Sequence, residues 1–195
     1  MEVAGGRGEA AAGVLDGFDE DGGDGVGALL EDGGLDLVIS TVRPHRPGIL
    51  TTPLMDEEFA LVAGARWRGV LTAESIAEKG PRALENVPVI AYSTDLNALR
   101  IYWTTVFDEV PDFRPQAVIP DLRAVLAAVR AGAGIAVLPT HLCAEELDRG
   151  DICVLHEPEL PPINTLFIAT RAGEPETPAV TAARTHLLVQ AKRWH

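Results

Sequence analysis

The chain has 195 residues, of which 47% are hydrophobic, and its formal net charge is −13 at pH 7. That length suits one sizeable domain or two small lobes. The acidic balance argues against a nucleic-acid surface, because phosphate binding requires clustered lysine and arginine. No apolar run approaches the roughly 18 residues that span a bilayer, and the N-terminus does not resemble a signal peptide. We therefore expect a cytoplasmic protein without membrane or nucleic-acid contacts of its own.

The first 34 residues differ in composition from the rest of the chain. They hold nine acidic residues, one base and 11 of the 19 glycines. Within them, residues 1–25 show neither a strand-like run nor a sustained helical period. Such a segment buries too little apolar surface to offset the entropy cost of ordering, so it is predicted to be disordered. An acidic interaction tail is the alternative interpretation.

From Val26 onward, helical and strand patterns alternate. In chain order, the pattern predicts a helical turn at 26–30, strands at 35–39 and 59–63, a helix at 73–78, a strand at 87–91, a helix at 96–110, a strand at 117–119, a helix at 122–129, a strand at 135–138, a helix at 141–147, strands at 152–155 and 165–169, and a helix at 178–194. This alternation predicts an α/β fold with a mainly parallel sheet.

The stretch 121–139, with the sequence DLRAVLAAVRAGAGIAVLP, is the most informative part of the chain. Asp121 is suited to cap a helix, and the apolar residues that follow have helical spacing. Gly132 and Gly134 are suited to end that helix, and the apolar run 135–138 predicts a buried strand. A helix that feeds a strand through a two-glycine turn is half of a parallel α/β unit.

This stretch resembles the "VaaGlGiaLLP" segment in the effector domain of LysR-type transcriptional regulators. Five other segments resemble that family in the same order: LDLVI at 35–39, LMDEEFALV at 54–62, PVIAYS at 88–93, LDRG and ICVL within 147–155, and TLFIATR at 165–171. No single match is specific, but six in the right order are stronger evidence. The chain is thus similar to this family over about 26–194.

The resemblance implies an α/β fold of the periplasmic-binding-protein type II class, with two α/β lobes joined by two crossover strands. Lobe I is expected at 26–57 and 164–195, and lobe II at 58–163. The family's helix-turn-helix and linker helix have no counterpart here, and neither do the first strand and helix of lobe I. We therefore expect a truncated regulator, produced by a wrong start codon, a frameshift or a decayed gene.

The resemblance also implies a ligand site, because open parallel sheets bind ligands at the carboxyl ends of their strands, near helix N-termini. The residues expected to bind the ligand are Ser40, Thr41, Arg43, Tyr92, Ser93 and Thr94. Two alternatives remain open. Ser93, Thr94 and Asp95 are also suited to cap the following helix, and Arg43 is more readily explained as a solvated loop residue.

By resemblance, a small-molecule effector, a carboxylate or an aromatic acid, would shift the population of lobe arrangements. The family also implies a dimer or an assembly with a full-length regulator. In such a dimer, the first helix of lobe I would cover the helix at 96–110. Without that first helix, Trp103 and Phe107 are expected to be exposed. Two rival functions are a solute-binding protein of the same fold and a fragment that binds and poisons a full-length regulator; exposed aromatic residues would favour the second.

No pattern indicates catalysis, a metal or a cofactor. At Gly132 and Gly134 the helix precedes and the strand follows, the reverse of a dinucleotide-binding turn. The five histidines lack HxxxH and HExxH spacing. His141 and Cys143 have no orienting acid that would favour a nucleophile pair, and Cys143 and Cys153 are expected to be free thiols. The chain is therefore not expected to be an enzyme.

Overall fold

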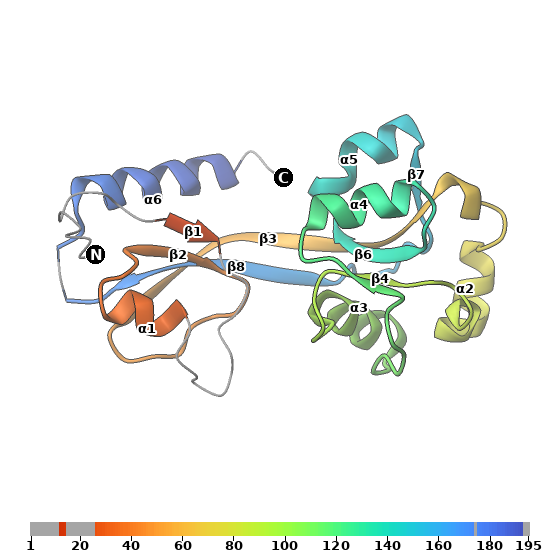
Figure 1. Ribbon diagram of the computed structural model, residues 1–195, viewed down its shortest axis with the longest axis horizontal. Coiled ribbons are helices and arrows are strands. Elements are labelled where there is room, and N and C mark those ends of the chain that lie inside the picture. Colours follow the sequence, from red (N-terminus) through yellow and green to blue (C-terminus); the bar gives the residue numbers. More distant parts are fainter. Residues whose placement is uncertain (1–11, 15–25, 174, 193–195) are drawn as a thin grey trace, which may run out of the picture. The chain divides into compact units, whose positions relative to one another are not determined.

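The computed structural model describes residues 12–14, 26–173 and 175–192. The chain divides into two compact units. Unit 1 comprises Met1–Asp56 and Thr165–His195, and unit 2 comprises Glu57–Asn164. Two strands, β3 (Ile49–Gly64) and β8 (Ile163–Arg171), have residues in both units (Figure 1).

Unit 1 is a sheet with a helix on each face. Its sheet has the order β1-β2-β8-β3. The elements other than β3 and β8 are β1 (Ala12–Val14), α1 (Val26–Glu31), β2 (Leu37–Ser40) and α6 (Pro178–Ala191). Alternate residues of a strand point to opposite faces. Val38 therefore packs on Leu30 of α1, whereas Leu37 packs on Val180 of α6, which places α1 and α6 on opposite faces (Figure 1).

Arg171 links the end of α1 to the start of β2 through hydrogen bonds. Its Nη1 donates hydrogen bonds to the carbonyl oxygens of Leu30 at 2.9 Å and Leu35 at 2.7 Å, and its Nη2 contacts Asp36 Oδ1 at 2.8 Å. The two carbonyl groups lie at the end of α1 and just before β2, so one side chain bonds the helix end, the loop and the strand start. A guanidinium suits this task because it offers several donors in a fixed plane.

The first strand of unit 1 differs from the sequence-based expectation. Ala12–Val14 pairs in parallel with β2, with Gly13 opposite Val38. For these three residues the predicted disorder is wrong, and a strand occupies the edge of β2 that the sequence left without a partner. Backbone pairing with a preformed edge explains the difference, since Ala-Gly-Val carries no strand pattern of its own. The rest of the segment 1–25 lies outside the described residues.

Unit 2 is also layered. Its elements besides β3 are the 3-10 helices η1 (Ala65–Trp67) and η2 (Gly80–Leu84), the helices α2 (Ala73–Lys79), α3 (Asn97–Phe107), α4 (Leu122–Arg130) and α5 (Thr140–Arg149), and the strands β4 (Ile90–Ala91), β5 (Ala117–Val118), β6 (Ile135–Pro139) and β7 (Ile152–Val154). Leu61 and Ile135 face a core shared with α2 and α3, whereas Val62 and Leu138 face a core shared with α4 and α5. The sheet thus lies between two helical layers (Figure 1).

Strand direction differs from the prediction of a mainly parallel sheet. β3 pairs antiparallel with both β6 and β7, and β2 pairs antiparallel with β8. Parallel pairing occurs between β1 and β2 and between β4 and β5, and in one bridge between Val89 and Ile135. Alternation of helices and strands predicts direction only for consecutive βαβ units. A long strand that passes through two units does not follow that rule.

The turn between α4 and β6 confirms the prediction made for it. The Asp121 carboxylate accepts hydrogen bonds from the N–H groups of Arg123 at 2.8 Å and Ala124 at 3.0 Å, so it caps α4. Gly132 has φ +80°, which ends the helix. At Gly134 a Cβ would collide with the carbonyl oxygen of Pro88, to which Ile135 N donates at 2.8 Å.

The aromatic face of α3 corrects a second expectation. Trp103 is 3% exposed, which contradicts its predicted exposure, whereas Phe107 is half-buried and remains partly exposed. Trp103 contacts Phe107 and Phe113 edge-on, each at 5.3 Å between ring centroids. Phe113, in the loop after α3, covers Trp103, which was expected to be exposed. The burial of Trp103 weakens the argument from exposed aromatic residues that favoured a poisoning fragment.

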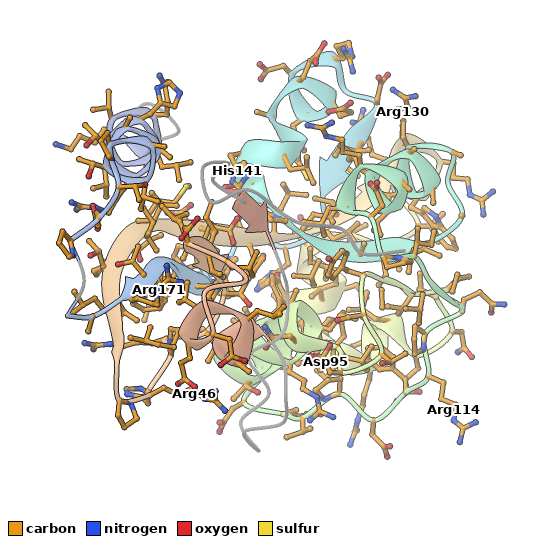
Figure 2. The ribbon with its side chains drawn as sticks, turned by 60° about the vertical axis from the view of Figure 1, so that its left-hand side comes forward. Arg46, Asp95, Arg114, Arg130, His141 and Arg171 are labelled. Carbon is orange, nitrogen blue, oxygen red and sulfur yellow. The ribbon has the colours of Figure 1, made fainter. Side chains whose placement is uncertain are left out.

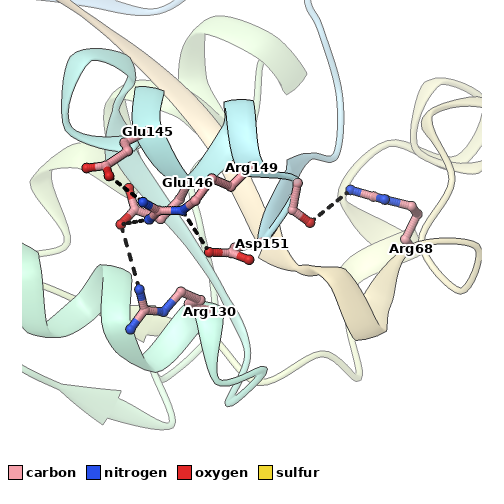
Figure 3. Close-up of polar contacts among 7 residues, drawn as sticks. Arg68, Arg130, Glu145, Glu146, Arg149 and Asp151 are labelled. Carbon is pink, nitrogen blue, oxygen red and sulfur yellow. Dashed lines mark hydrogen bonds and ion pairs between the residues drawn. The ribbon is translucent and has the colours of Figure 1, made fainter.

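Arginine side chains join the end of α5 to its neighbours on the surface of unit 2 (Figure 3). Arg149 pairs with Glu145, with Glu146 at 3.2 Å and with Asp151 at 3.2 Å, and Arg130 of α4 approaches Glu146 at 3.9 Å. Exposed ion pairs contribute little individually. Their shared members nevertheless connect α4, α5 and the start of β7.

Candidate functional site

The predicted residues of unit 1 form one turn after β2. Ser40 is 1% exposed, and its hydroxyl donates to the carbonyl oxygen of Val42 at 2.6 Å while accepting from Val42 N at 3.2 Å. Thr41 is half-buried and Arg43 is exposed. Ser40 therefore holds the turn in shape, and Thr41 and Arg43 carry the accessible polar groups.

The predicted residues of unit 2 form a second turn, between β4 and α3. The Ser93 hydroxyl donates to the Asp95 carboxylate, which also accepts from Asn97 N at 3.4 Å. Arg100 Nε donates to the Asp95 carbonyl oxygen at 2.8 Å. Asp95 thus orders the turn before α3, although the N-cap position itself is Leu96 and has no side-chain cap. Tyr92 and Ser93 are half-buried and Thr94 is exposed.

Leu96 closes this turn in a conformation that leucine rarely adopts. It has φ +60° and ψ +31°, and its N–H donates to the Ser93 carbonyl oxygen at 3.4 Å. A left-handed residue with a Cβ costs about 1 kcal/mol or more. The Leu96 side chain is 8% exposed and belongs to the core of unit 2, so packing holds the backbone there. No signal in the sequence indicates a left-handed leucine.

Three strands of unit 2 end at one edge of its sheet. β5 is parallel to β4, and the bridge between Val89 and Ile135 makes β6 run in the same direction. Their carboxyl ends lead into α3, α4 and α5. Helix N-termini present unpaired N–H groups and a positive dipole end, so this edge favours a negatively charged ligand. The Asp121 carboxylate already occupies the start of α4, whereas the start of α5 has no side-chain cap.

The start of α5 carries a polar pair that sequence reasoning missed as part of a site. His141 Nε2 lies 3.9 Å from Glu57 Oε1 of β3. Burial lowers the pKa of His141 below its usual value, which favours the neutral imidazole. The rule applied to Ser93, that polar residues after a buried strand lie at a ligand edge, also applies to Thr140 and His141 after β6, and it would have found them.

The environment of Cys143 does not suit the thiol to act as a nucleophile. Its side chain is fully buried, and burial followed by the charge of Glu146 raises its pKa to about 12. A thiol with so high a pKa holds its proton and is a poor nucleophile at neutral pH. Within residues 12–14, 26–173 and 175–192, no group of three or more His, Cys, Asp or Glu side chains is placed to hold a metal ion. Over the same ranges, no helix combines the length and apolarity needed to cross a membrane.

The six predicted residues thus fall into two turns, one in each unit, at the carboxyl ends of β2 and β4. Each turn is locally ordered by its own hydrogen bonds. The accessible polar groups are those of Thr41 and Arg43 in unit 1 and of Tyr92, Ser93 and Thr94 in unit 2. The start of α5 adds backbone N–H groups and His141 to the second set.

The sequence is similar to one protein family and to a curated member of the regulators that contain it. The family model for the LysR substrate binding domain matches residues 18–192. The HTH-type transcriptional regulator AbaB of Streptomyces antibioticus is 42% identical over 159 residues, which are 82% of this chain and 53% of that regulator. The chain therefore spans about half the length of this curated relative.

Two solved structures are similar in fold. ArgP from Mycobacterium tuberculosis matches with a TM-score of 0.68 and 21% identity, over 84% of this chain and 53% of that chain. Full-length LysG from Corynebacterium glutamicum, with the effector Arg bound, matches with a TM-score of 0.62 and 20% identity, over 84% and 53%. At these identities the likeness is one of fold, here the periplasmic-binding-protein type II fold that the sequence predicted.

Proposed function

The chain belongs to the LysR substrate-binding domain family, and from that membership we propose that it senses a small-molecule effector for a transcriptional regulator. The observation that carries the proposal is the family match over 18–192 together with 42% identity to a transcriptional regulator. Binding of the effector, and not a chemical reaction, produces the regulatory signal in this proposal. We place this activity in the cytoplasm, where a bacterial regulator meets its DNA.

We propose Thr41, Arg43, Tyr92, Ser93 and Thr94 as effector contacts, with Ser40 shaping the turn of unit 1 and His141 added from the structure. Thr41 and Arg43 offer a hydroxyl and a positive charge in unit 1. Thr94 offers an exposed hydroxyl beside the start of α3 in unit 2. Ser93 acts mainly through its bond to Asp95, because its proton is already donated to that carboxylate.

The effector proposed for these residues carries a carboxylate. The support is electrostatic: Arg43 is exposed, and the edge of unit 2 where α5 begins lacks a side-chain cap. Backbone N–H groups at a helix N-terminus and a guanidinium are both suited to carboxylates. An aromatic acid is one member of this class, and the half-buried Tyr92 is the ring that would contact it.

The proposed output is a shift between arrangements of the two units. β3 and β8 connect the units, and at their boundary Thr165 Oγ1 donates to Asp56 Oδ1 at 2.6 Å. A ligand changes such an equilibrium by its difference in affinity for the two states. In the complete regulator, this shift would change how a DNA-binding domain and a partner copy of the regulator contact the operator.

A panel of small carboxylates, aromatic acids and amino acids would test the proposal on the full chain. Thermal stability identifies a ligand, because a ligand that binds only the folded state raises Tm. Calorimetry then gives its Kd for the wild type and for Thr94→Val. Loss of one hydrogen bond to a charged ligand is expected to raise Kd about tenfold.

Thr104→Val is the matched control, since Thr104 is an exposed threonine on α3 outside the turn. It should bind like the wild type, and Arg43→Gln should bind more weakly. Equal Kd values for Thr94→Val, Arg43→Gln and Thr104→Val would contradict the assignment of these residues. A panel without any stabilising ligand would argue against the effector class.

A further inference from the structure

A surface hollow in unit 2 lies apart from the residues proposed for the effector. Its volume is about 700 Å³, within the roughly 300 to 1,000 Å³ typical of small-molecule sites. One wall is Ile76–Arg82, from the end of α2 into η2, and the other is the end of α3. His156, after β7, completes the lining. All of these segments belong to unit 2.

Aromatic rings form the apolar part of this hollow. The Phe107 ring stacks on the His156 imidazole, with 6.3 Å between centroids and 24° between planes. Phe107 is also held edge-on by Trp103 at 5.3 Å and by Tyr102 at 5.9 Å. Trp103 and Tyr102 are 3% and 0% exposed, so a rigid core positions the half-buried ring. A fixed, partly open aromatic surface is suited to stacking with a flat ring.

Positive charge lies at the rim of the same hollow. Lys79 and Arg82 line it and are exposed. Over the part of the chain that the structure describes, neither cation takes part in an ion pair. Glu78 and Glu109 also line the hollow, so the local charges balance. Two carboxylates in the wall would repel a dianion, while the cations can still bind one carboxylate.

We propose that this hollow binds a flat aromatic monocarboxylate. The ligand ring stacks on the Phe107 and His156 pair, and its carboxylate accepts hydrogen bonds from Arg82 and Lys79. Arginine is favoured for such a contact because its planar guanidinium binds carboxylates through two parallel bonds. The chain then has a ligand site beyond the one proposed for its effector.

The two sites use opposite ends of α3. Tyr92–Thr94 precede the helix, whereas Phe107 is its last residue. At 1.5 Å per residue, the eleven residues of α3 span about 16 Å. No residue is shared, so the failure of one site leaves the other intact.

Calorimetry and saturation-transfer NMR on the full chain test the proposal with benzoate as the probe. Benzamide lacks the charge, cyclohexanecarboxylate lacks the flat ring, and phenyl phosphate carries a second charge. We expect benzoate to bind best of the four. Arg82→Gln should raise its Kd about tenfold, and Phe107→Leu should remove the preference for benzoate over cyclohexanecarboxylate.

Arg114→Gln is the matched control, because Arg114 is exposed and projects away from unit 2 (Figure 2). It should leave the Kd of benzoate unchanged, as should Thr104→Val, whose exposed residue lies in neither site. Benzoate binding that is lost in Thr94→Val but kept in Arg82→Gln would place the ligand at the effector turn and overturn the second site. An unchanged Kd of benzoate in Arg82→Gln would mean that the carboxylate does not bind at this rim, and it would overturn the proposal as well.

Discussion

The hydrogen bonds of Asp95 decide what its neighbours offer to a ligand. Its carboxylate accepts from the Ser93 hydroxyl and from Asn97 N. Ser93 can therefore accept a hydrogen bond from a ligand, but it must break its bond to Asp95 to donate one. The Ser40 hydroxyl likewise has no proton to donate to a ligand, because it already donates to the carbonyl oxygen of Val42. The two serines thus shape the turns, and Thr41, Thr94 and Arg43 are left as donors.

Cys143 gives a stability prediction at the residue scale. Burial and Glu146 raise its pKa from 9.0 to about 12, so the folded state holds the thiol proton more tightly than the unfolded chain does. The free energy of unfolding should therefore be unaffected by this group below pH 9 and should fall as pH rises above it. The limiting slope for one such group is about 1.4 kcal/mol per pH unit.

Urea unfolding at intervals between about pH 8 and 10 measures that slope. Cys143→Ala should lower stability at every pH through its cavity, yet flatten the pH dependence. Cys153→Ala is the matched control and should keep the wild-type slope. An unchanged slope in Cys143→Ala would show that another group titrates on unfolding.

At the scale of elements, α3 begins and ends at residues with positive φ. Leu96 has φ +60° before the helix, and Asp108 has φ +54° after it. Asp108 N and Glu109 N both donate to the Trp103 carbonyl oxygen, which ends the helix. Aspartate tolerates this conformation, but leucine does not favour it. The ends of α3 are therefore set by what the helix packs against, and less by the preferences of the terminal residues.

The turn between α4 and β6 should tolerate no side chain at Gly134. Gly134→Ala should lower the free energy of unfolding by about 3 kcal/mol, because a Cβ would collide with the backbone of Pro88. Gly150→Ala is the comparison: it has φ +73°, but its Cβ would meet only Arg68 Nη2 at 3.9 Å. It should cost about 1 kcal/mol from backbone strain alone. If urea unfolding showed the same loss of unfolding free energy for Gly134→Ala and Gly150→Ala, the collision with Pro88 would be contradicted.

Across the whole molecule, apolar burial is concentrated in unit 2. Its two clusters include Leu61, Tyr102, Val129, Ile135 and Leu138, all with exposure of 0%. The clusters of unit 1, as far as the described residues show, hold three buried residues each. Because apolar burial contributes about 25 cal/mol per Å², unit 2 should be the more stable part.

Hydrogen exchange tests this difference between the units. The amides of β6, a fully buried strand, should exchange by global unfolding, whereas those of β2 should exchange through local opening of unit 1. Exchange followed by mass spectrometry across increasing urea should therefore show at least two protection classes. A single class for β6 and β2 would mean that both units unfold together.

The sequence alone determined the fold family, the chain order of the helices and strands, and the turn from Asp121 to Pro139. These features are local, since a cap, a helical period and a glycine at a helix end depend on residues close in the chain. It also pointed to the turns after β2 and β4, because polar residues after a buried strand lie at a sheet edge.

Only the tertiary structure decided the features that join distant residues. The direction of β3 and the pairing of Ala12–Val14 depend on segments far apart in sequence, and the burial of Trp103 depends on how the loop with Phe113 folds back onto α3. The role of Ser93 depended on the position of the Asp95 carboxylate, and the hollow of unit 2 depended on how α2, α3 and His156 pack together. Local preference predicts elements, whereas packing between them decides which side chains remain free to bind.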